Sequence, residues 1–145
     1  MIDRFNLGLA ALLIIGVCGL TGCGQQPTMA PFVGVVTYKG KLLEFGGVTM
    51  QPKGGGPVAR GTIQPDGTFS VETDGKPGAM IGTHRVRVTC YTSQRPGATT
   101  ASTDGEMSLG KPLIPEHYSN FSSSGLEVEV MPEGNQRVSI QLSSP

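Results

Sequence analysis

The stretch Thr83-His84-Arg85-Val86-Arg87-Val88-Thr89-Cys90-Tyr91 alternates more regularly than any other part of the chain. Its odd and even positions differ in character, as they do in a β-strand with one buried and one solvated face. The side chains that share the inward face are those of His84, Val86, Val88 and Cys90. The stretch predicts a half-buried strand, and it indicates that the fold is built from β-sheets.

Other stretches are also enriched in β-branched and aromatic residues or alternate with a period of two. They cover residues 32–38, 47–52, 58–64, 68–73, 126–130 and 136–142. Turn residues separate them, including Gly40 and the Asp66-Gly67 pair, which suits a hairpin. No stretch carries a helical apolar stripe. We therefore expect an all-β fold, a seven-stranded antiparallel β-sandwich.

Two of these stretches carry opposite charges on their solvated faces. Arg85 and Arg87 lie on one, and Glu127 and Glu129 lie on the other. If the strands are neighbours in one sheet, cross-strand ion pairs of about 0.2–1 kcal/mol each would join them. The pattern thus makes a prediction about strand order.

The N-terminal segment has the form of an export signal. Residues 7–20 are almost wholly apolar, and the run is shorter than the roughly 20 residues that span a bilayer. The following Leu20, Thr21, Gly22 and Cys23 resemble the lipobox of bacterial lipoproteins. That resemblance implies cleavage before Cys23 and thioether attachment of a diacylglycerol, with further fatty acyl chains such as palmitate. An ordinary signal peptide with an incidental cysteine, or an uncut signal anchor, is the alternative.

This interpretation divides the chain into three parts: residues 1–22 as a lipoprotein signal peptide, residues 23–31 as a tether, and residues 32–142 as one domain. The formal net charge is zero, so electrostatics offer no argument for nucleic acid as a partner. With Cys18 in the signal and Cys23 lipidated, only Cys90 remains in the domain. We expect it to be a buried, inert thiol, with intermolecular pairing as the minor alternative.

Residues that could carry chemistry are few. His84 faces inward on its strand, so a core or hydrogen-bonded histidine is favoured over a ligand. His117 lies in the proline-rich segment 112–121, where we expect Tyr118 to pack on the sandwich. No spacing suggests a metal site or a catalytic triad, so we expect no catalytic residue, metal or cofactor. The loops at residues 53–57 and 92–111 are candidate binding surfaces.

Several motifs resemble those of carboxypeptidase regulatory-like domains. Residues 33–41 followed by 47–50 are similar to the opening of that family, and Pro65-Asp66-Gly67-Thr68-Phe69 is similar to its hairpin motif. Residues 82–88 resemble its G-x-Y-x-V-x-V strand, and residues 114–118 and 124–130 resemble the tail of small lipoproteins of the planctomycete type. The resemblance implies a transthyretin-like, immunoglobulin-like sandwich with Greek-key connections. Its motifs consist of turn glycines and core positions, which carry no activity.

Together these features predict a lipid-anchored, non-catalytic module of the cell envelope, with the outer membrane or periplasmic face as its location. Its partner would be an envelope protein or a glycan, and a purely structural envelope component is the alternative. Hydroxyisourate hydrolases share the transthyretin-like sandwich but end in Tyr-Arg-Gly-Ser, whereas this chain ends Gln141-Leu142-Ser143-Ser144-Pro145. The partner and the oligomeric state are not indicated by the sequence.

Overall fold

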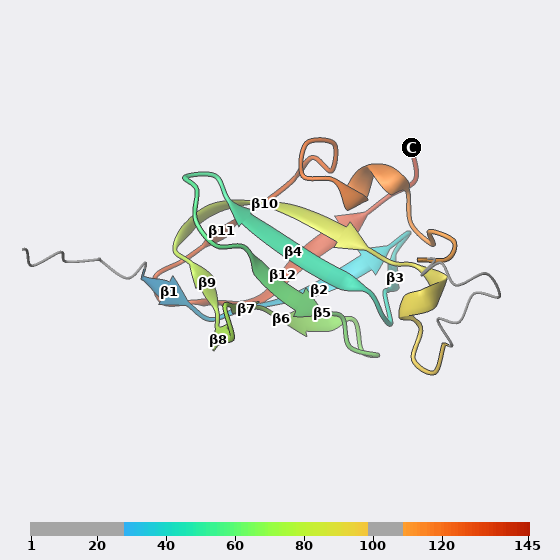
Figure 1. Ribbon diagram of the computed structural model, residues 1–145, viewed down its shortest axis with the longest axis horizontal. Coiled ribbons are helices and arrows are strands. Elements are labelled where there is room, and N and C mark those ends of the chain that lie inside the picture. The colour runs from blue at the N-terminus through green and yellow to red at the C-terminus, as the bar shows by residue number, and fades with distance from the viewer. Residues whose placement is uncertain (1–27, 99–108) are drawn as a thin grey trace, which may run out of the picture.

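The computed structural model describes residues 28–98 and 109–145. These residues form β-strands and two short 3-10 helices, η1 (Thr92–Gln94) and η2 (Glu116–Ser119) (Figure 1). The all-β prediction is confirmed. Within the described residues no helix is long and apolar enough to cross a membrane.

The larger sheet has six strands in the order β11-β10-β4-β5-β7-β8. They are β4 (Gly47–Pro52), β5 (Ala59–Thr62), β7 (Glu72–Thr73), β8 (Lys76–Pro77), β10 (Gly82–Thr89) and β11 (Leu126–Val130). β10 lies between β4 and β11 and is antiparallel to both. His84, Val86 and Val88 are buried and Arg85 is exposed, which confirms the alternation predicted for this stretch.

The second sheet is built on β2 (Phe32–Tyr38), with β12 (Asn135–Leu142) on one side and β3 (Lys41–Leu42) and β6 (Thr68–Ser70) on the other. β12 runs parallel to β2, so the expectation of a wholly antiparallel fold is wrong for this pair. Alternation along a strand gives the face that each residue occupies. It gives neither the neighbouring strand nor its direction, and these two strands are about one hundred residues apart.

The predicted strand at residues 68–73 is divided between the two sheets. β6 pairs with β2, whereas β7 pairs with β5. Val71 lies at the crossing, is buried, and donates its backbone N–H to the carbonyl of Phe32 at 3.3 Å. Gly61 of β5 lies so close to the Ser70 carbonyl that a Cβ would clash with it, so the crossing requires glycine there.

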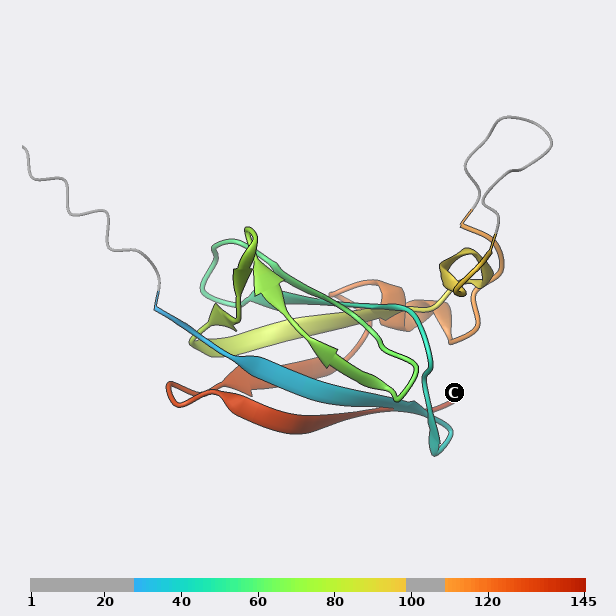
Figure 2. The ribbon, with the colours of Figure 1, turned by 90° about the horizontal axis from the view of Figure 1, so that it is seen from below.

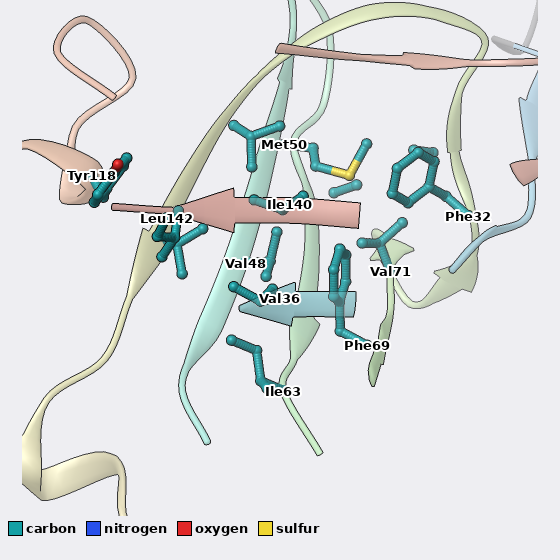
Figure 3. Packing of buried hydrophobic residues seen from close by; sticks show 14 of the residues in the cluster. Phe32, Val36, Val48, Met50, Ile63, Phe69, Val71, Tyr118, Ile140 and Leu142 are labelled. Carbon is teal, nitrogen blue, oxygen red and sulfur yellow. The ribbon is translucent and has the colours of Figure 1, made fainter. Parts of the chain in front are cut away.

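The core fills the space between the sheets, which Figure 2 shows on edge, with β2 and β12 below β4 and β10. Side chains from both sheets point toward one another there, including those of Val36, Val48, Met50 and Ile140 (Figure 3). The rings of Phe32 and Phe69 lie 6.2 Å apart between centroids. The core therefore draws on both sheets and gives the molecule its sandwich-like, two-layered form.

Two segments are more ordered than expected. β1 (Met29–Ala30) pairs with β9 (Ala79–Met80), and Ala30 is buried. This short pair lies within residues 23–31, the stretch predicted to be tether, and it adds Ala30 and Ala79 to the core. The segment 112–121 was expected to be extended, but residues 116–119 form η2, which buries Tyr118 as predicted.

A polar hollow on the outer face of β10 is the candidate functional site

The outer face of β10 ends in a hollow of about 480 Å³. It lies where β10, η1 and η2 meet, at the end of the molecule that also carries the C-terminus (Figure 1). Hydrogen-bonding side chains make up most of its lining. The lining residues are Arg87, Thr89, Tyr91, Gln94, Leu109, Glu116, Ser119 and Asn120.

Backbone pairing at residues 91–94 and 111–113 fixes one wall of the hollow. Tyr91 forms an isolated antiparallel bridge with Pro112, and Thr92 donates its N–H to the Lys111 carbonyl at 3.0 Å. The Gln94 side chain accepts from the Tyr91 N–H at 2.8 Å and donates to Thr89 Oγ1 at 3.3 Å. The base of loop 92–111 is therefore anchored to β10, and residues 99–108 of that loop lie outside the described residues.

The opposite wall comes from η2 and the residues that follow it. Tyr91 Oη lies 3.4 Å from Ser119 Oγ, which ties this wall to the base of the loop. The Arg87 guanidinium lies over the Phe121 ring, 5.2 Å from its centroid, in a cation–π arrangement. The ring therefore holds the guanidinium in place at the edge of the hollow.

Arg87 has no carboxylate partner within the described part of the chain. Its Nε is buried and lacks a hydrogen-bond partner there. A guanidinium carries five donors in a planar fork, which suits carboxylates and paired oxygen acceptors. Arg87 thus combines a fixed position with unused donor capacity, and it is the residue best placed to bind a ligand.

A second hollow, of about 320 Å³, adjoins the first across Phe121. Arg85, Leu126 and Glu127 contribute to its lining. β10 and β11 are neighbours with Arg85 directly opposite Glu127, so the predicted strand order is confirmed.

The expected ion pairs are not formed. Glu127 instead pairs with Lys53 at 2.9 Å, and the hydrogen bond and charge of Lys53 lower its pKa, with a smaller contribution from Arg85. Arg87 lies beyond the end of β11, since the last paired residues are Val86 and Leu126. Both arginines therefore remain available along the outer face of β10.

A third hollow, of about 530 Å³, lies on the outer face of β4 and β5. Arg60 and Glu72 line it and face each other across the strands, and no aromatic side chain contributes to it. It therefore offers no ring for stacking, unlike the hollow beside β10, which Tyr91 lines. We regard the hollow beside β10 as the better candidate.

The lipobox residues Leu20, Thr21, Gly22 and Cys23 lie outside the described residues. Cys90 is buried and free, which confirms the predicted burial of this thiol, and burial raises its pKa.

The two histidines are the remaining sequence candidates. His84 is 1% exposed, and its Nδ1 lies 3.0 Å from the Gly82 carbonyl, which confirms a hydrogen-bonded core histidine. Burial lowers its pKa, and its Nε2 has no partner among the described residues. The His117 ring packs beside that of Tyr118, 4.0 Å between centroids. Within residues 28–98 and 109–145, no group of three His, Cys, Asp or Glu side chains could hold a metal ion.

Phe121 and Asn120 were missed by sequence reasoning, whereas Gln94 lies in loop 92–111, which was predicted to be a candidate binding surface. Phe121 follows an irregular segment and meets Arg87 only through the fold, so no local pattern marks it. No family model, curated protein or solved structure matches the chain.

Proposed function

We propose that the protein is a lipid-anchored, non-catalytic module of the cell envelope that binds an envelope protein or glycan at the hollow beside β10. The observation that carries the proposal is the Arg87 guanidinium, which lies over Phe121 beside that hollow and whose buried Nε has no partner among the described residues. Amide, hydroxyl and aromatic groups surround it, and such groups recognise sugar hydroxyls and peptide backbones alike. The volume of the hollow, about 480 Å³, falls within the range of small-ligand sites.

The proposed fold family is that of carboxypeptidase regulatory-like domains, with a transthyretin-like, seven-stranded Greek-key sandwich. The support is the correspondence between the seven predicted stretches and the main strands. These strands are β2, β4, β5, β6 with β7, β10, β11 and β12. In this architecture the loops at the ends of the sheets carry binding, and the hollow lies at one such end.

The proposed anchor is a diacylglycerol on Cys23. The short apolar run and the small residues before the cysteine support it. β1 begins at Met29, so the few residues between Cys23 and β1 would hold the domain close to the membrane surface. The outer membrane or periplasmic face is the proposed location.

Metabolic labelling with a fatty acid tests the anchor. We expect labelling of the full-length chain, globomycin-sensitive processing, and loss of both in Cys23→Ala. Unchanged labelling of Cys23→Ala would refute lipidation at this residue.

Affinity capture of the full-length lipoprotein from its own envelope tests binding. We expect Arg87→Gln to lose the captured protein or glycan. Arg60→Gln is the matched control, because Arg60 is an arginine on the outer face of the same sheet but lines a different hollow. Equal capture by both variants would exclude the β10 hollow as the site.

Deletion of residues 95–109 separates the binding module from the structural alternative. If loop 92–111 presents the binding surface, the deletion should weaken capture. If every captured partner is retained, loop 92–111 does not contribute to binding. If the parent chain itself captures no partner, a purely structural envelope component is favoured.

A further inference from the structure

β12 forms an edge of its sheet. One contact shows which of its residues direct their backbone N–H and C=O groups toward β2 and which direct them outward. The Leu142 carbonyl accepts a hydrogen bond from Lys39, the residue after β2, at 3.0 Å. In a parallel ladder, alternate residues direct both backbone groups to the same neighbour. Ile140 and Leu142 therefore direct theirs to β2, and Ser139 and Gln141 direct theirs away from it.

Both ends of this outer edge are closed. At the C-terminal end, Ser143 donates its N–H to Tyr118 Oη at 3.0 Å, and Tyr118 Oη–H donates back to the Ser143 carbonyl at 3.3 Å. Figure 3 shows Tyr118 beside the end of β12. At the other end, the register shifts between Asn135 and Val138, and Arg137 has a φ of 60°. The regular open edge is thus confined to Ser139 and Gln141.

The open edge is exposed and uncharged. Ser139 and Gln141 are exposed, and no other described residue bonds to their outward backbone groups. β11, the edge of the other sheet, carries Glu127 and Glu129, and charged residues of this kind protect edge strands from pairing. Two copies joined through β11 would bring their glutamates together, whereas two copies joined through the open edge of β12 would bring together the uncharged side chains of Ser139 and Gln141.

We propose that the β12 edge pairs with the β12 edge of a second copy of this chain. An antiparallel arrangement places Ser139 of each copy opposite Gln141 of the other, with a two-fold axis beside Ile140. Each of these pairs can exchange both N–H···O=C bonds. The outward N–H and C=O groups of Ser139 and Gln141 therefore all gain a partner. The contact is isologous and closes as a dimer. This inference is independent of the proposed ligand and of the lipid anchor.

The register of the proposed dimer can be tested with two matched variants of the full-length chain. Ser139→Lys with Gln141→Lys places like charges directly opposite each other. Ser139→Lys with Gln141→Glu places opposite charges at the same positions. Sedimentation equilibrium in density-matched detergent should show a dimer for the parent chain. We expect the dimer dissociation constant of the like-charge variant to be about tenfold higher than that of the opposite-charge variant.

Gln141→Pro provides a second test. The N–H of Gln141 points away from β2, so proline removes an outward donor without removing a bond of the β2–β12 ladder. We expect a monomer whose urea unfolding transition remains cooperative. A parent chain that is monomeric at all concentrations would overturn the proposal. So would equal dimerisation of the two charge variants, which would place the contact on another surface.

Discussion

Gly34 and Phe69 offer the most direct test of the packing between β2 and the core. The two residues are opposite each other in the β2–β6 pair. A Cβ on Gly34 would lie 2.6 Å from both Cε1 and Cζ of Phe69 and 2.9 Å from the Val138 carbonyl oxygen. Phe69 is 1% exposed and the carbonyl belongs to a β-strand, so neither can move aside freely.

The expected effect of Gly34→Ala is a loss of stability. Overpacking of a core costs about 1–3 kcal/mol, and the lower chain entropy of unfolded alanine offsets about 0.4–1 kcal/mol of it. We therefore expect the free energy of unfolding to fall by about 1.3 kcal/mol, the middle of the range that the two terms leave. Urea denaturation of the full-length chain, followed by circular dichroism, measures the change.

Gly54→Ala is the matched control, because a Cβ at Gly54 meets nothing within 4 Å. Only the entropy term remains there, so its free energy of unfolding should rise by about 0.4–1 kcal/mol. In the Phe69→Leu background, the smaller side chain should reduce the cost of Gly34→Ala, giving a favourable coupling in a double-mutant cycle. A Gly34→Ala variant as stable as Gly54→Ala would refute the reasoning.

Three further changes test other parts of the core. Burial lowers the pKa of His84, so the unfolded chain takes up a proton that the folded chain resists. Stability should therefore fall as the pH drops below the ordinary histidine pKa of 6.5, and urea titrations of His84→Leu should lack that loss. Cys90 is buried with a raised pKa, so iodoacetamide should modify it only once urea unfolds the domain. Peptide mass spectrometry measures the extent of modification. Modification in native buffer at the rate of the unfolded chain would contradict the structure. Tyr118→Phe removes both hydrogen bonds to Ser143 and should cost about 0.5–1.5 kcal/mol of unfolding free energy, whereas no change would show that this cap is unimportant.

Much of the strand content could be predicted from the sequence, because burial of one face imposes alternation. Val86 and Val88 illustrate this, since both are buried and the arginine between them is not. Turn chemistry was equally informative: Asp66 accepts hydrogen bonds from the N–H and hydroxyl of Thr68, as an Asp-Gly turn predicts.

Features that depend on distant segments could not be predicted in this way. The parallel pairing of β12 with β2 and the change of sheet at Val71 depend on which strands meet, and no local period records that. The candidate site has the same origin. Arg87 was placed correctly on a solvated face, but its contact with Phe121 joins residues from different elements.

The parallel pair between β2 and β12 also has a consequence for biosynthesis. β2 is made before every other described strand except β1, and its neighbour β12 is made after all of them. The sheet that contains β2 is therefore completed only after the strands of the other sheet have been made, and such long-range pairing slows folding. Until β12 joins β2, Ile140 and Leu142 are missing from the core, so its final packing depends on the strand that is synthesised last among those described.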